Sequence, residues 1–235
     1  MVHYHDSRDS TEDEPKAMPD TTFLEADLRE RAETDIQVGF WLMFFLSFIT
    51  LGFFRFFTIW QLIARRDRHF RRLSRLAEDL TVYLRDRSQE AGADLSGPLR
   101  ELEHVQRALR AAASERGAAL WTLLCFFTSP IGELVLFYTL MSDFTQHEAL
   151  EQRMMGALHA AFAALGEPRR LPFRTEIPPR SFWLYFLLMF FTGGLFAVYW
   201  WYSLITDPNR HFDAHEEWES GLARILAPPQ TASSL

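Results

Sequence analysis

Apolar and polar residues are segregated along this 235-residue chain. Residues 36–64, 118–142 and 182–206 form three blocks that hold most of the aromatic side chains and few charges. Each block is at least as long as the ~20 apolar residues that a helix needs to cross ~30 Å of hydrocarbon. The remaining residues offer too little surface to bury all three blocks in a soluble fold. The pattern therefore predicts an integral membrane protein.

The three blocks are copies of one unit. The third block matches the first at an offset of 142 residues, and the second block matches the first at an offset of 78 residues. In every copy a threonine is followed 19 residues later by a histidine. The pairs are Thr50 and His69, Thr128 and His147, and Thr192 and His211. Phe-rich segments can resemble one another by chance, but the shared spacing favours duplication.

A break interrupts each apolar block. Gly and Pro inside an apolar run loosen or kink a helix, and a threonine hydroxyl can bond to the backbone groups that are freed. The predicted breaks are formed by Thr50, Gly52, Thr128, Pro130, Gly132, Thr192, Gly193 and Gly194. The sequence thus predicts an all-α integral membrane fold of three repeated helix–break–helix apolar units with amphipathic helices between them.

The segments that follow the blocks are predicted to be helices outside the bilayer. Residues 65–117 carry two leucine-rich stripes around a central loop, which predicts an extramembrane helical hairpin similar to a coiled coil. Residues 143–181 are expected to form an amphipathic helix and a Pro-rich linker. Residues 207–235 are expected to form a C-terminal amphipathic helix and tail, with Asp207 and Pro208 as its cap and first turn.

Two topologies fit this pattern. Each block is either one kinked span, so that the chain crosses three times, or a re-entrant hairpin whose tip enters the bilayer and returns. The connectors 65–117 and 143–181 hold 12 and 5 arginines. Three crossings would place one of them outside, against the tendency of basic loops to stay cytoplasmic. That favours hairpins, although arms of about 12 residues reach only ~18 Å. The closer similarity of copies one and three favours crossings.

Charge is concentrated at the N-terminus. The first 35 residues carry the whole net charge of −7, which predicts an acidic, disordered tail. His3 and His5 in that tail are weak candidates for metal ligands. Cys125 is the only cysteine, so no internal disulfide can form.

Arg55 and Glu133 are ionisable residues inside the apolar blocks, where a charge is costly and suggests a function. They occupy equivalent positions of copies one and two. Opposite charges at equivalent positions predict an intramembrane ion pair between the copies. The alternative is that both lie at a membrane interface and contact only water and headgroups.

An arginine-rich stretch follows the first block. It is predicted to contact the anionic headgroups of the lipid bilayer, and this makes nucleic acid an unlikely partner. The predicted headgroup contacts are Arg65, Arg66, Arg68, Arg71, Arg72 and Arg75.

The repeated histidines permit a metal site or a proton relay, but their position just beyond each apolar block favours simple anchoring at the membrane interface. His211 and His215 have a spacing that can bind zinc on a helix. The residues between them supply no general base of the zinc-protease kind. The sequence predicts no metal, no cofactor and no catalytic residue, and therefore no enzyme.

The break motif is similar to a signature of uncharacterised bacterial membrane proteins, among them the YjgN-like inner-membrane family. The signature is Thr-x-Gly, an aliphatic residue, an aromatic residue and a short aromatic run that ends in Trp. Residues 192–200 are similar to it throughout, residues 50–54 match its first half, and the middle copy departs from it with Pro130 in place of Gly. The resemblance implies a bacterial cytoplasmic (inner) membrane protein and carries no activity with it.

Two functions follow as hypotheses. The first is a structural, scaffolding or self-associating membrane protein, with a second copy or another protein bound through the extramembrane helices. The alternative is a component of a small-molecule or ion transporter or channel, in which Arg55 and Glu133 would line a polar path. The first is favoured because a transport path usually gathers more than two charged residues.

Overall fold

The computed structural model describes residues 21–226, which form helices joined by turns and one extended linker. The helices are α1 (Thr22–Thr34), α2 (Phe40–Ile49), α3 (Phe54–Ala91), α4 (Ser96–Ala112), α5 (Ala118–Thr128), α6 (Ile131–Ala164), α7 (Phe182–Phe191) and α8 (Phe196–Leu226). No strand occurs within this range, which confirms the all-α class. His3 and His5 lie outside the described residues.

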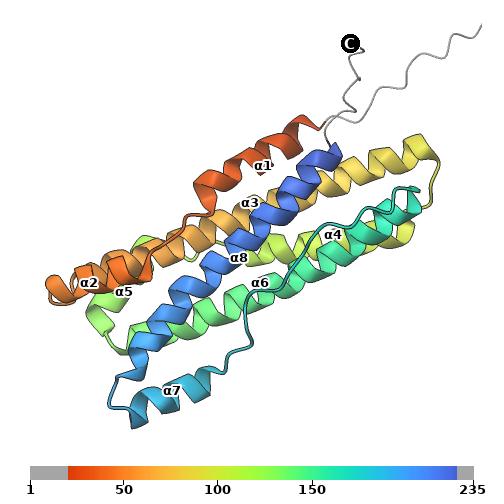
Figure 1. Cartoon of the computed structure of the whole chain (residues 1–235). Helices are drawn as coiled ribbons and strands as arrows, with labels where there is room; N and C mark the ends of the chain where they lie inside the picture. Colours follow the sequence, from red (N-terminus) through yellow and green to blue (C-terminus); the bar gives the residue numbers. More distant parts are fainter. Residues whose placement is uncertain (1–20, 227–235) are drawn as a thin grey trace, which may run out of the picture.

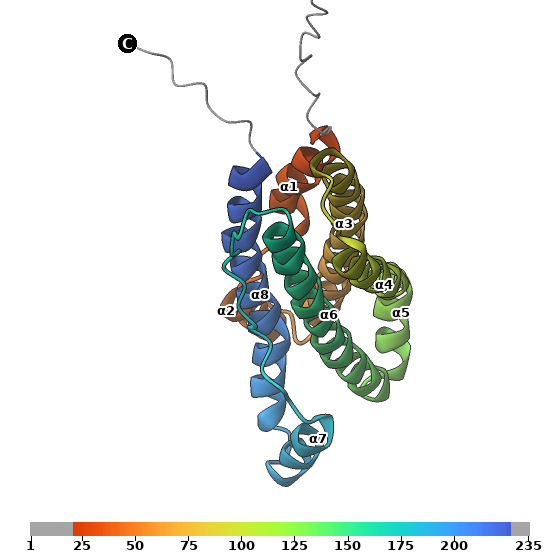
Figure 2. The same ribbon diagram turned by 90° about the vertical axis from the view of Figure 1, so that its right-hand side faces the viewer.

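Three long helices, α3, α6 and α8, form the body of the molecule and run in the same direction, from lower left to upper right in Figure 1. A short helix precedes each one and folds back beside its beginning, so that α2, α5 and α7 all lie at one end (Figures 1 and 2). Helix α4 packs against α3 and α6, and α1 packs against α3. Among residues 21–226, no helix has both the length and the apolar character that a membrane crossing requires.

A threonine builds the turn between the short and the long helix. The Thr50 hydroxyl donates to the Leu46 carbonyl at 2.8 Å and accepts from the Phe54 amide at 2.9 Å. Thr192 makes the same two bonds, four residues to either side, at 2.7 and 2.9 Å. One side chain therefore satisfies the last turn of one helix and the first turn of the next, where backbone groups otherwise lack partners.

The backbone of the first and third turns is left-handed at two successive positions. The φ angles are 51° at Leu51 and 91° at Gly52, and 61° at Gly193 and 93° at Gly194. Glycine adopts these angles without the clash that a Cβ causes. The equivalent Gly and Leu show that the first copy tolerates a side chain where the third has none.

The middle turn is built differently, since Ser129–Pro130 is a cis peptide and Pro130 directly precedes α6. Gly132 was expected to contribute to the break but lies inside the first turn of α6. A Cβ at Gly132 would lie 2.3 Å from the Thr128 hydroxyl and 3.3 Å from the Cα of Cys125. Gly132 is therefore required for the close approach of α5 to α6.

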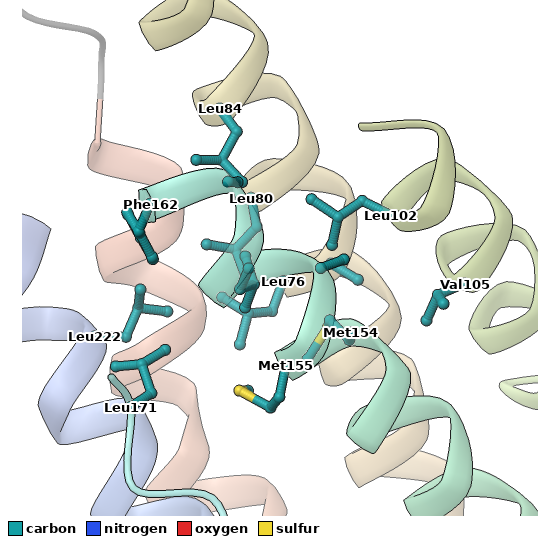
Figure 3. Close-up of a cluster of buried hydrophobic side chains, with 14 of the residues drawn as sticks. Leu76, Leu80, Leu84, Leu102, Val105, Met154, Met155, Phe162, Leu171 and Leu222 are labelled. Carbon is teal, nitrogen blue, oxygen red and sulfur yellow. The ribbon is translucent and has the colours of Figure 1, made fainter. Parts of the chain in front are cut away.

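The end of the bundle opposite the short helices has a conventional apolar core, part of which Figure 3 shows. The leucine stripe of residues 65–117 supplies much of it. Its buried members in α3 include Leu73, Ala77, Leu80 and Leu84. Helices α4, α6 and α8 complete the core with residues such as Leu102, Val105, Met154, Met155, Phe162 and Leu222 (Figure 3). The segment 65–117 is thus part of a larger bundle, because its stripe packs against α6 and α8 as well as α4.

Part of the acidic N-terminal segment is helical, which corrects the expectation of a disordered tail over residues 1–35. Helix α1 buries Leu24 in the core, and Leu28 packs against it. On the other side of α1, Glu30 forms an ion pair with Arg75 of α3. The three-to-four-residue spacing of the leucines gives the helix one apolar face despite its many charges.

Pro208 does not start a helix but lies within α8, which also corrects the sequence analysis. A proline inside a helix leaves the carbonyl four residues earlier without its amide partner. Here that carbonyl belongs to Leu204, and it accepts a hydrogen bond from Arg65 at 3.1 Å. Arg65 also donates to the Ile205 carbonyl and to the Asn209 side chain. The buried guanidinium of α3 thereby allows α8 to continue past the proline.

Candidate functional site

The three repeated histidines meet inside the bundle. His69 of α3, His147 of α6 and His211 of α8 are joined by His215, one turn further along α8, and all four are at most 1% exposed. The expectation that these histidines anchor the protein at a membrane interface is wrong, because their imidazoles have no access to lipid or solvent. We call these four residues and Glu151 the histidine cluster.

Glu151 of α6 lies at the centre of the histidine cluster. Its Oε1 is 2.9 Å from Nε2 of both His147 and His215. The same oxygen is 3.4 Å from Nε2 of His211 and 3.8 Å from Nε2 of His69. Each of the four imidazoles thus directs its Nε2 toward one carboxylate.

A second set of carboxylates holds the other ring nitrogen of three imidazoles. Nδ1 of His69 is 2.8 Å from Asp35 Oδ1, and Nδ1 of His215 is 2.8 Å from Glu219 Oε1. Nδ1 of His211 is 3.5 Å from Glu148 Oε1. A carboxylate beside Nδ1 favours the tautomer with the proton on that nitrogen, which leaves the Nε2 lone pair directed at the centre.

Arg72 of α3 binds two of these outer carboxylates. It donates to both oxygens of Glu219, at 2.8 and 2.9 Å, and to Asp35 Oδ2 at 3.0 Å. Its side chain is fully buried. The site therefore combines four buried carboxylates with one guanidinium, so its charge balance depends on the imidazoles or on another cation.

The pKa values follow from this crowding. Burial tends to raise the pKa of the Glu151 carboxyl, but the neighbouring imidazoles, led by His211, hold it well below its usual value. Burial lowers the pKa of His147 to about 3, so this imidazole is neutral. Burial also opposes the charge on His215, but Glu151 and Glu219 outweigh it and raise its pKa to about 10.

The structure brings Arg55 and Glu133 together near the turns of the first two copies. A guanidinium nitrogen of Arg55 lies 3.1 Å from Glu133 Oε1, and the Ser129 hydroxyl donates to the same oxygen at 2.8 Å. The Glu133 side chain is 8% exposed and that of Arg55 36% exposed. Arg55 also lines an apolar cavity of about 270 Å³ between α2, α3 and α8.

Removal of either partner of this pair is expected to lower thermal stability. Arg55→Ala leaves the buried Glu133 without its counter-charge, and Glu133→Ala leaves Arg55 facing apolar residues. The double variant should lose less than the sum of the two single losses, and exchanging the residues (Arg55→Glu with Glu133→Arg) should recover part of the loss. Thermal unfolding of the four variants measures this, and simple additivity would show that the two residues act independently.

The predicted headgroup contacts divide into two groups. Arg65, Arg66 and Arg72 are at most 1% exposed, so they cannot reach lipid, which corrects the prediction for these three. Each is buried because it satisfies groups inside the bundle, as Arg66 does by donating to the Ala112 carbonyl at the end of α4. The remaining members at the surface are Arg68, Arg71 and Arg75.

The exposed apolar surface is confined to one end of the molecule. Among residues 21–226, every exposed large hydrophobic side chain except Phe23 and Val82 belongs to α2, α5, α7, the turns after them or the first turns of the long helices. We call these three helix–turn–helix segments the apolar hairpins. Their tips are the most exposed, with Leu51 at 91% and Phe191 at 78%.

Comparisons with protein-family models, curated proteins and solved structures found no match. The similarity of the break motif to YjgN-like proteins therefore stays a prediction.

Proposed function

We propose that this chain is a non-enzymatic structural membrane protein whose three apolar hairpins insert into one leaflet of a bacterial cytoplasmic membrane from the same side. The observation that carries the proposal is the confinement of exposed apolar side chains to the hairpin end of the bundle. Apolar patches of this kind on a protein surface mark membrane or protein contacts.

The dimensions of the hairpins support insertion to about half the depth of the bilayer. Helices α2 and α7 have 10 residues each and α5 has 11. At 1.5 Å per residue they are about 15 Å long, which is half of the ~30 Å hydrocarbon thickness. Thr50 and Thr192 satisfy the backbone groups at the tips internally, as hydrocarbon requires.

The positions of surface arginines are consistent with this depth. Arg68 and Arg210 occupy equivalent positions in the first and third copies, and both reach the surface of the bundle. Arg68 follows the start of α3 by 14 residues, or about 21 Å. Half of a bilayer with its headgroups measures about 20–22 Å, so both guanidinium groups would lie among anionic headgroups.

The rest of the bundle would then stand outside the hydrocarbon on one side. It includes α4, whose outer surface carries exposed charged residues, and it is where a protein partner or a second copy would bind. The transport alternative requires a polar path, whereas the cavity beside Arg55 is lined mainly by aromatic and aliphatic side chains.

Liposome flotation tests the proposal. The purified chain, transferred from detergent to liposomes, should rise with them in a density gradient and should stay bound after a wash at high salt, because salt screens electrostatic contacts but not apolar insertion. A chain that remains at the bottom of the gradient, or that high salt releases, would contradict insertion.

A further inference from the structure

The histidine cluster contains buried polar atoms that have no hydrogen-bond partner. Among the described residues they include Nε2 of His69, Nε2 of His211 and Oε2 of Glu151, in side chains that are at most 1% exposed. An unsatisfied buried group costs about 1–3 kcal/mol, and native proteins contain few of them. Several such atoms gathered in one place suggest that they bind something other than protein.

The geometry around Glu151 is that of a metal site. One ligand atom from each of His69, Glu151, His211 and His215 lies within 4.8 Å of the other three. A tetrahedral zinc ion with bonds of ~2.0–2.1 Å needs ligand atoms on the order of 3.3 Å apart. The distances from Glu151 Oε1 to the three Nε2 atoms, 2.9 to 3.8 Å, are centred on this spacing.

The outer carboxylates match the surroundings of metal-bound histidines. A histidine ligand usually donates its other ring N–H to a carboxylate or a carbonyl, which fixes the orientation of the ring. Asp35, Glu219 and Glu148 lie at Nδ1 of His69, His215 and His211 in this way. Arg72 in turn fixes Asp35 and Glu219.

Charge also favours a cation at this place. Four carboxylates and one guanidinium share a volume without access to solvent, and uncompensated charge there is costly. Imidazole ligands favour first-row transition metals, whereas Mg²⁺ and Ca²⁺ prefer sites made of oxygen atoms.

We propose that His69, Glu151, His211 and His215 bind one first-row transition-metal dication, for which Zn²⁺ is the simplest occupant. The ion connects α3, α6 and α8 at equivalent positions of the three repeat copies. Its role is structural, since it fixes the three long helices at one level above the apolar hairpins. His147 stacks on Phe70 with ring centroids 3.7 Å apart and supports Glu151 from the side.

Zn²⁺ binding to the full chain tests the proposal. The protein, purified in detergent without a polyhistidine tag and stripped with EDTA, should bind one Zn²⁺ per chain, and Co²⁺ should give the visible absorption of a tetrahedral site. The thermal unfolding midpoint should rise with Zn²⁺ and fall again with EDTA, but it should not respond to Mg²⁺. Absence of both stoichiometric binding and a midpoint shift would overturn the proposal without the use of any variant.

Variants locate the ion. His211→Gln should weaken Zn²⁺ binding by more than about 100-fold, and Asp35→Asn, which removes only an orienting group, by about 10–100-fold. His104→Gln is the matched control, because His104 is exposed on α4 and should bind Zn²⁺ like the wild type. The double variant His3→Gln/His5→Gln should also be unaffected. Unchanged affinity in His211→Gln, or loss of binding in either control, would overturn the assignment.

Discussion

Arg72→Ala should destabilise the protein by about 3–5 kcal/mol, the loss expected when one partner of a buried ion pair is removed. Arg72 is the guanidinium that links Asp35 and Glu219, and all three side chains are at most 3% exposed. Without it, both carboxylates remain buried beside the histidine cluster, and either they become protonated or the site opens to water. Chemical denaturation of the detergent-solubilised chain measures the loss.

Two further variants identify the cause of this effect. Arg72→Lys keeps the charge but cannot bind both oxygens of Glu219 and Asp35 together, so it should recover only part of the stability. Arg71→Ala removes the neighbouring arginine, whose pair with Glu115 is exposed, and should change stability by less than about 1 kcal/mol. Equal losses in Arg71→Ala and Arg72→Ala would show that the buried network contributes nothing specific.

Aspartate at the three hairpin tips should release the protein from membranes. The proposed variant combines Leu51→Asp, Phe127→Asp and Phe191→Asp, one change in each apolar hairpin, at side chains that are 75–91% exposed. An aspartate in the hydrocarbon centre costs about 2.5–3.5 kcal/mol, so the three together cost roughly 7–10 kcal/mol. Such a loss exceeds what a peripheral attachment can withstand, and the variant should remain at the bottom of a flotation gradient.

The control for this variant uses the two exposed large hydrophobics outside the hairpins. Phe23→Asp with Val82→Asp removes apolar surface from α1 and α3 at a distance from the hairpin tips. Since these side chains would face water in the proposed orientation, this variant should float like the wild type. If the tip variant also floats, the apolar hairpins are not the membrane contact.

The repeat and its turns were accessible from sequence because their cause is local. Thr50 and Thr192 bond only to residues four positions away, and glycine supplies the left-handed backbone between the two helices. Pro208 was misinterpreted for the opposite reason. Its carbonyl partner comes from Arg65, which is 139 residues from Leu204, and no local pattern indicates such a bond.

The histidine cluster shows a stronger limit. Sequence analysis identified three of its histidines by their constant distance from the threonines, yet it placed them at the surface. That distance contained the missing information: three parallel helices that start at equivalent turns bring residues 19 positions further along to the same level. Asp35 and Glu219 could not be found in this way, because they are 34 and 147 residues from the side chains they bind.

Labelling of single cysteines tests one-sided insertion most directly. In a Cys125→Ala background, Ala91→Cys after α3 and Thr175→Cys in the linker place exposed thiols in the two connectors, and Leu51→Cys places one at a tip. In sealed, uniformly oriented proteoliposomes, a membrane-impermeant maleimide should label residues 91 and 175 from the same side and residue 51 from neither side. Labelling of residues 91 and 175 from opposite sides would contradict the account and would establish membrane-crossing segments in place of re-entrant hairpins.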